Sequence, residues 1–214
     1  MRKSKTQLAM LLAVILTANF SISWAQDNAD QFKGFNVIQL KNGSNQIDIN
    51  GDGVADNIFV ARRENFNAHG FDLFAFYVWH KETVIDDRWH VVPFLDEKGG
   101  EPYEKEHLIT LEGADCILSD IRMLRAAASK SAPVIVIKGI REFGNSFLDE
   151  APVAFQVYEL RRNKEMIVGY PPYYFELTRT IAGKKKYCDI NDAFQQELGL
   201  AWGRSDRLQN PALK

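Results

Sequence analysis

The sequence predicts a mainly β protein, an antiparallel β-sandwich with one short helix near its C-terminus. Runs of β-branched and aromatic residues recur along the chain, and each run is bounded by glycine, asparagine or aspartate. The runs follow one another at intervals of roughly ten to twenty residues, which is typical of sandwiches and barrels. No linker or internal repeat divides the chain, so we expect a single β-sandwich domain over residues 26–214.

The expected strands can be placed from these runs. They cover Phe35–Leu40, Asn57–Arg62, Phe71–Trp79, Trp89–Leu95, Ile117–Leu124, Val134–Glu142, Val153–Leu160 and Tyr173–Ile181. The strand Phe71–Trp79 is apolar on both faces, so it lies either between two layers or against another subunit. A helix is expected after Asp189 or Asn191, because both are good N-cap residues, and Gly199 ends it. Residues 126–131 are expected to form a hairpin loop.

The N-terminus has the parts of a secretory signal peptide. Basic residues at its start are followed by the apolar stretch 8–20. That stretch is too short for a membrane span, and Ala25 is a small residue where a signal peptidase cleaves. We therefore predict that residues 1–25 are a signal peptide and that the exported mature chain begins at Gln26 and has no membrane span.

The charge argues against a nucleic-acid or anionic-membrane partner. Residues 1–25 contain three basic and no acidic residues, so their removal changes the net charge from −2 to −5. Both kinds of partner need a basic patch. Basic runs in the mature chain are short, such as Arg161–Arg162 and Lys184–Lys186, and each of these two is expected at the solvated end of a hairpin.

Two cysteines, Cys116 and Cys188, remain in a chain that is expected to be exported. In an oxidising compartment this number makes one disulfide bond, which would contribute about 4 kcal/mol by restricting the unfolded chain. A zinc-thiolate site would need further ligands at short spacing, such as Cys-x-x-Cys, and the sequence has none. We therefore predict a Cys116–Cys188 disulfide.

The stretch 48–56 has the spacing of a calcium-binding loop. Its expected ligands are Asp48, Asn50, Asp52, the backbone carbonyl of Val54, and Asp56. Phe59 stands where an EF-hand carries its bidentate glutamate, so this is a shorter loop between strands. Calcium is expected to bind with a Kd of about 10⁻⁴ to 10⁻³ M and to act structurally. The alternative is a polar turn in which the same side chains bond to nearby backbone groups.

Known catalytic motifs are missing from the sequence. It has no Gly-x-Ser-x-Gly, no Ser-x-x-Lys and no histidine pair at zinc-binding spacing. This favours a protein that is not an enzyme. The alternative is a cell-envelope hydrolase of unknown substrate whose site combines a carboxylate, His69 and Arg62 or Arg63.

Two stretches are candidate ligand-binding segments. Arg62 and Arg63 open a polar stretch in which a guanidinium can bind a carboxylate through two hydrogen bonds. Tyr173 and Tyr174 belong to an aromatic cluster that suits an apolar pocket wall. The alternatives are a solvated loop for the first stretch and core or interface packing for the second.

Several long segments of the chain carry a family resemblance: "DINGDGVADNIFVARRENFNAHGFD", "WHVVPF", "ADCILSDIRMLR", "APVAFQVYELRRN", "PPYYFELTRT" and "YCDINDAFQQELG". With the signal peptide, they resemble the CarG family of bacterial carbapenem intrinsic-resistance proteins. The resemblance implies a periplasmic antiparallel β-sandwich that forms a homodimer and protects the cell against carbapenems without hydrolysing them. The expected partner is the antibiotic or its envelope target. The strand Phe71–Trp79 is the expected subunit interface, and the resemblance implies no catalytic residues.

Overall fold

The structure is a computed structural model of the 214-residue chain. It describes residues 28–67, 69–82, 85–98, 101–113 and 115–201. The expected signal peptide lies outside these residues. Within them, no helix is long and apolar enough to cross a membrane.

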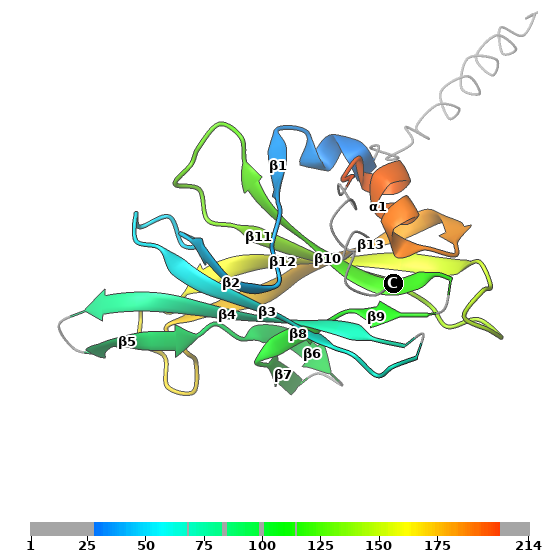
Figure 1. The fold of residues 1–214 in the computed structure, drawn as a ribbon. Coiled ribbons are helices and arrows are strands. Elements are labelled where there is room, and N and C mark those ends of the chain that lie inside the picture. Colours follow the sequence, from blue (N-terminus) through cyan, green and yellow to red (C-terminus); the bar gives the residue numbers. More distant parts are fainter. Residues whose placement is uncertain (1–27, 68, 83–84, 99–100, 114, 202–214) are drawn as a thin grey trace, which may run out of the picture.

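Two β-sheets packed face to face make up most of the described chain (Figure 1). The strands of the larger sheet are β1 (Phe35–Ile38), β6 (Phe94–Lys98), β7 (Glu101–Lys105), β9 (Leu111–Glu112), β10 (Ile117–Ala126), β11 (Ile135–Arg141), β12 (Ala151–Arg162) and β13 (Tyr173–Tyr187). The strands of the smaller sheet are β2 (Gly43–Ile47), β3 (Asp56–Arg63), β4 (Phe71–Glu82), β5 (Ile85–Val91) and β8 (His107–Ile109).

The larger sheet has the strand order β1-β10-β11-β12-β13-β6-β7, with β9 beside β10, and the smaller has the order β2-β3-β4-β5, with β8 beside β4. Among the described pairs, β13 and β6 run parallel and all others run antiparallel. A 3-10 helix, η1 (Asn28–Phe32), precedes the strands, and the helix α1 (Ile190–Leu198) follows them. The predicted fold class, a mainly β sandwich with one short C-terminal helix, is confirmed.

One predicted strand is wrong, because Trp89–Leu95 is two strands in different sheets. The first, β5, ends at Val91 in the smaller sheet, and β6 begins at Phe94 in the larger one. Pro93 stands between them and has no backbone N–H to donate to a strand ladder. Its carbonyl oxygen accepts a hydrogen bond from the Phe175 N–H at 2.8 Å, whereas the preceding N–H, of Val92, donates to Phe76 at 2.9 Å. The chain therefore changes sheets at Pro93.

Apolar side chains fill two separate cores. The core between the sheets contains Ile49, Ile58, Val60, Phe74, Phe76, Val78, Val92, Phe94, Leu108, Ile121, Met123, Val134, Val136, Tyr158, Tyr173 and Phe175. The second core lies between the other face of the larger sheet and α1 and η1, and contains Phe32, Ile117, Leu124, Ile137, Val153, Phe155, Val157, Ile181, Tyr187, Ile190, Ala193, Phe194, Leu198 and Leu200. The larger sheet is thus covered on both faces where α1 packs.

The helix α1 begins and ends where the sequence predicts. The Asp189 side chain accepts a hydrogen bond from the Asn191 N–H at 2.8 Å, which is N-cap geometry, and Gly199 ends the helix with a φ of 67°. Gly139 on β11 allows the helix to approach the sheet, because a Cβ there would lie 2.6 Å from a ring carbon of Phe194.

The two ends of the sandwich carry different loops. We call one the aspartate-loop end, because it holds loop 48–56 between β2 and β3, together with the turn 163–172 between β12 and β13. We call the other the disulfide end, because it holds Cys116 and Cys188, together with the loops 64–70 and 142–150. The aspartate-loop end is on the left in Figure 1 and the disulfide end is on the right.

Candidate functional site

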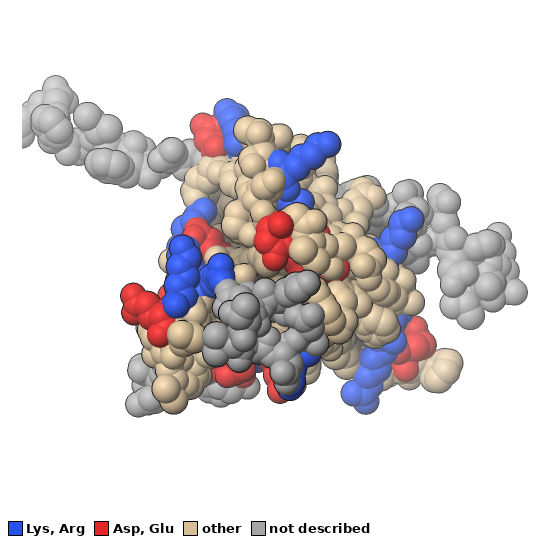
Figure 2. All heavy atoms as spheres, turned by 90° about the vertical axis from the view of Figure 1, so that its left-hand side faces the viewer, with Lys and Arg blue, Asp and Glu red and all other residues tan. Residues whose placement is uncertain are grey.

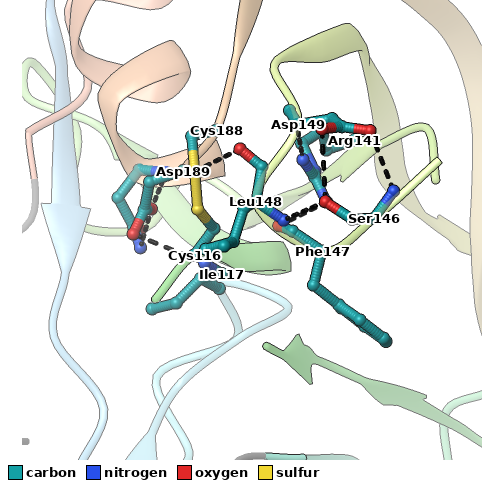
Figure 3. Close-up of a disulfide and its surroundings, with 10 residues drawn as sticks. Cys116, Ile117, Arg141, Ser146, Phe147, Leu148, Asp149, Cys188 and Asp189 are labelled. Atoms are coloured by element: carbon teal, nitrogen blue, oxygen red, sulfur yellow. Dashed lines mark hydrogen bonds between the residues drawn. A yellow bond between two sulfur atoms is a disulfide. The ribbon is translucent and has the colours of Figure 1, made fainter. Parts of the chain in front are cut away.

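The predicted disulfide is present at the disulfide end. Cys116 lies just before β10 and Cys188 just after β13, with their Cα atoms 5.5 Å apart. The carbonyl oxygen of Leu148 lies 3.5 Å from the Cys188 sulfur, so loop 142–150 rests against the bond (Figure 3). The disulfide therefore ties two strands of the larger sheet to the start of α1.

A buried arginine, Arg141, donates hydrogen bonds to the backbone of loop 142–150. The Arg141 guanidinium donates to the carbonyl oxygen of Phe147 at 3.0 Å and to that of Asp149. The Asp149 carboxylate accepts hydrogen bonds from the Ser146 N–H at 2.8 Å and the Ser146 hydroxyl at 3.2 Å (Figure 3). The backbone N–H of Ser146 contributes most to holding the pKa of Asp149 below its usual range. The loop is thus ordered by polar contacts, while Phe143 stays exposed.

A shallow pocket of about 430 Å³ opens beside this loop. It is lined by Glu142, Phe143, Gly144, Asn145, Asp149, Glu150, Ala151, Pro152 and Lys186. Three of these residues are acidic and one is basic, so the pocket wall carries a net negative charge. Such a wall favours cationic over anionic ligands.

The guanidinium of Arg62, a predicted ligand-binding group, is already bound within the protein. It donates two hydrogen bonds to the Glu112 carboxylate, at 2.7 and 3.0 Å, and lies 3.6 Å from Asp72. These hydrogen bonds with Glu112 raise the pKa of Arg62 above its usual range. The bidentate fork that was expected for a ligand carboxylate is therefore occupied by Glu112.

The predicted carboxylate–His–Arg cluster does gather around Glu112, and its role as a hydrolase site stays a prediction. His69 Nδ1 lies 3.4 Å from the Glu112 carbonyl oxygen, and its ring packs on that of Phe147 with the centroids 4.5 Å apart. The neighbouring Arg63 lies over the Phe71 ring, 5.3 Å from its centroid. The contact of His69 with Phe147 joins loop 64–70 to loop 142–150.

Tyr173 and Tyr174 lie at the opposite end of the sandwich from Arg62, so the structure does not bring the two candidate ligand-binding segments together. Tyr173 is buried, and burial raises its pKa, to which the charges of Asp52 and Asp56 add. Asp56 and Arg62 stand near the two ends of β3 and are about 20 Å apart, since an extended residue spans ~3.3 Å. Tyr174 packs on Tyr170 with ring centroids 5.6 Å apart. Both tyrosines belong to the aspartate-loop end.

In loop 48–56, the predicted calcium ligands bond to the loop itself. The Asp48 carboxylate accepts from the Gly51 N–H at 2.6 Å and the Gly53 N–H at 2.9 Å. The Asp52 carboxylate accepts from the Val54 N–H at 2.8 Å and the Asn50 side-chain amide at 2.9 Å. Within the described ranges, no group of three or more His, Cys, Asp or Glu side chains is placed to hold a metal ion.

Asp56, the last of the predicted carboxylate ligands, faces inward. Its carboxylate is fully buried and accepts hydrogen bonds from the Ile49 N–H at 2.8 Å and the Trp79 N–H at 3.0 Å. Burial raises the pKa of Asp56 to about 6, against the opposing effect of these two hydrogen bonds. The side chain thus joins loop 48–56 to β4. Each oxygen keeps a second lone pair, and the role of calcium ligand stays a prediction for Asp56.

The outward side of the smaller sheet is apolar and partly exposed. Cross-strand pairing puts the side chains of Phe59, Ala75, Tyr77, Trp79, Trp89, Val91 and Ile109 on this side, which we call the apolar face. Phe59, Trp89, Val91 and Ile109 are between 41% and 45% exposed. The strand Phe71–Trp79 was expected to be apolar on both faces, and it contributes Trp79 to this side and Phe76 to the core. The apolar face is therefore an exposed surface that suits a protein partner.

Sequence reasoning missed a buried charged network between β10 and α1. Arg122 is fully buried and donates to the Asp120 carboxylate at 3.1 Å and to the side-chain oxygen of Asn191. Its guanidinium also lies over the Phe194 ring, 4.4 Å from the centroid. The available signal was the alternation of Asp120 and Arg122 inside an otherwise apolar strand.

Comparison with known proteins identifies the family. Residues 40–196 match the family described as "Carbapenem resistance protein CarG-like". The chain belongs to the CarG-like family. The matched residues include both cysteines and loop 48–56, and the protein is therefore related to carbapenem resistance.

A solved structure described as "Crystal structure of CarG" has a similar fold. Its TM-score is 0.62 at 19% sequence identity, and the match covers 76% of this chain and 98% of that chain. At this identity the likeness shows the fold alone. No curated protein matches the chain by sequence.

Proposed function

We propose that this protein protects a cell against carbapenems from the periplasm, without hydrolysing the drug. The match of residues 40–196 to the carbapenem-resistance family carries this proposal. Residues 1–25 have the form of a signal peptide. The Cys116–Cys188 disulfide supports an oxidising compartment such as the periplasm.

The charges of the described residues favour a protein that binds an envelope component over a protein that sequesters the drug. A carbapenem carries a carboxylate, and a protein that sequesters it would need a free cation beside an apolar wall. Here the Arg62 fork is bound to Glu112, and the pocket beside loop 142–150 has an acidic wall. Neither of these two places offers that combination, so we favour a protein or cell-wall component as the partner of the protective surface.

Expression in a carbapenem-sensitive strain tests the proposal. We expect a severalfold higher minimum inhibitory concentration, with the drug recovered intact from the medium. A matched chain that lacks residues 1–25 should give no protection, because it would stay in the cytoplasm. The β-lactam absorbance of the drug with purified protein should stay constant, and steady loss over many turnovers would establish the hydrolase alternative instead.

The apolar face also supports a homodimer. In a two-fold interface both subunits contribute the same residues, so one charged substitution puts two like charges into the interface. We expect Val91→Asp to raise the dimer Kd by about a hundredfold or more, since each uncompensated buried charge costs at least ~1–3 kcal/mol. Analytical ultracentrifugation measures this. Val54→Asp is the matched control, because Val54 is similarly exposed, at 45%, but lies in loop 48–56. Equal dimerisation of the two variants would remove the apolar face from the interface.

Calcium binding to loop 48–56 is part of the proposal. The side chains of half-buried Asn50 and exposed Asp52 would turn from their bonds to the loop toward an ion near Asp48. At a calcium concentration about ten times Kd, we expect the Tm to rise by about 2–4 °C. Asp52→Ala should abolish this rise, whereas Glu165→Ala, which lies outside loop 48–56, should keep it. If calcium and chelator give the same Tm for the unmodified protein, the loop is a polar turn.

A further inference from the structure

The chain contains two Asn-Gly pairs, one at the start of strand β2 and one in the loop that follows this strand. The first is Asn42–Gly43, and the second is Asn50–Gly51. Glycine has no side chain that would shield its backbone nitrogen, so in such pairs this nitrogen reaches the asparagine side chain easily. Both glycines have a positive φ, 94° at Gly43 and 82° at Gly51. Any difference in reactivity between the two pairs must therefore come from their surroundings.

The reaction that Asn-Gly pairs undergo is deamidation, and it needs only water. The glycine backbone nitrogen loses its proton and attacks Cγ of the asparagine. The bond from Cγ to the side-chain nitrogen breaks, and ammonia leaves with the proton. Water then opens the five-membered imide at either carbonyl, which gives aspartate or isoaspartate, the latter with a backbone that is one carbon longer. Hydrogen bonds that hold the glycine N–H or the asparagine amide slow the reaction, because they must break first.

The loop around Asn50 holds the groups that this reaction needs. The Gly51 N–H donates to the Asp48 carboxylate at 2.6 Å, and a negative charge beside this nitrogen opposes the loss of its proton. The Asn50 amide nitrogen donates to the Asp52 carboxylate at 2.9 Å, and the amide oxygen accepts from the Asp52 N–H at 3.0 Å. A Cβ at Gly51 would overlap the carbonyl oxygen of Ser131. The loop therefore has little room for a longer backbone.

Asn42 lacks this protection. Its side chain is exposed, and within the described ranges no hydrogen bond holds it. The surrounding turn is fixed by the Asn45 side chain, which accepts from the Lys41 N–H at 2.8 Å and donates to the carbonyl oxygens of Lys41 at 2.8 Å and Gly43 at 3.1 Å. These bonds leave the Asn42 side chain out. A Cβ at Gly43 would meet no atom within 4 Å, so water and a longer backbone have room there.

We propose that Asn42 is a site of spontaneous deamidation and that the hydrogen bonds of loop 48–56 protect Asn50 from the same reaction. Strand β2 is the edge strand of the smaller sheet, so the product places a negative charge beside that edge. The isoaspartate form also displaces the backbone where Gly43 pairs with Val60. A charged edge is a poor template for pairing with another strand.

The protection of Asn50 keeps the charge of the aspartate-loop end unchanged. Figure 2 views this end and shows acidic and basic side chains scattered separately, with uncharged surface between them. Deamidation at Asn50 would add a negative charge to a loop that already carries Asp48, Asp52 and Asp56. The inference needs neither bound calcium nor the proposed function.

Peptide mapping of the aged protein tests the proposal. The purified protein is kept in warm, mildly alkaline buffer with a calcium chelator, and mass spectrometry with fragmentation locates each deamidated residue and distinguishes aspartate from isoaspartate. We expect Asn42 to react at least about tenfold faster than Asn50, because bonds to charged acceptors must open before Asn50 reacts. In denaturant the two residues should react at similar rates, which gives the reference for the folded protein.

Asp48→Asn is the matched variant. It removes the carboxylate beside the Gly51 nitrogen and keeps the size of the side chain, so deamidation at Asn50 should become severalfold faster while that at Asn42 stays the same. Circular dichroism checks that the variant folds. The proposal is wrong if Asn50 reacts as fast as Asn42 in the folded, unmodified protein. It is also wrong if folding keeps Asn42 intact over the time in which Asn42 reacts in denaturant, or if the folded variant leaves the rate at Asn50 unchanged.

Discussion

Replacing Arg122 with methionine is expected to lower the free energy of unfolding by about 3–5 kcal/mol. The guanidinium is fully buried and donates to Asp120 and to the Ile121 carbonyl oxygen, the latter at 2.9 Å. Methionine fills similar space without charge, so the buried Asp120 carboxylate loses its counter-charge. The contact of the guanidinium with Asn191 of α1 is lost as well. Urea-induced unfolding measures the change.

Two further variants distinguish the loss of the Arg122–Asp120 ion pair from a loss of packing. Asp120→Asn combined with Arg122→Met removes both charges and should recover much of the lost stability, since a buried pair is often replaceable by neutral groups. Arg63→Met removes an exposed arginine and should change stability by less than about 0.5 kcal/mol. If the double variant is as unstable as Arg122→Met alone, the loss comes from packing and the ion-pair argument is wrong.

Loss of the disulfide is expected to cost about 4 kcal/mol. Cys116 and Cys188 are 72 residues apart in the sequence, and a cross-link over that distance restricts the unfolded chain strongly. Replacement of both cysteines by serine, or reduction with dithiothreitol, should therefore lower the denaturant midpoint without changing the fold. Hydrogen exchange should also become faster at the start of α1, because Cys188 directly precedes the helix.

The serine variant carries its own control for the disulfide prediction. Dithiothreitol should shift the midpoint of the unmodified protein and leave that of the double serine variant unchanged. An identical midpoint for the oxidised and reduced forms of the unmodified protein would show that the cross-link adds nothing to stability. The hydrogen bond from the Ile117 N–H to Asp189, at 3.4 Å, and the packing of α1 would then hold this end alone.

The sequence predicted the elements whose signals are local. The long strands, the helix with its Asp189 cap and the disulfide all follow from patterns that a few residues or a cysteine count contain. The short edge strands were missed because their residues are polar or contain proline, as in β2 and β7. Such strands form because a partner strand is beside them. The sheet change in Trp89–Leu95 did have a signal, Pro93, which a continuous strand does not tolerate.

The candidate site was harder to predict, because its contacts are set by strand pairing. Arg62 donates to Glu112, which lies 50 residues further along the chain. The residues next to Arg62 in the sequence do not indicate that partner. Asp56 matches the spacing of a calcium ligand, but its carboxylate meets the Trp79 N–H only once β3 and β4 have paired. Tyr173 and Arg62 were both candidates on their chemistry alone, and the fold places them at opposite ends.

Because the chain changes sheets at Pro93, neither sheet is complete until the two have met. Strands β10 to β13 follow one another in the sequence and pair as neighbours, so their hairpins close early and quickly in folding. The parallel pairing of β6 with β13, which puts Phe94 opposite Phe175, closes a loop of roughly eighty residues and is entropically slow. We therefore expect the transition state of folding to contain the β10–β13 meander. Strand β6 joins it only when water is excluded from the core between the sheets.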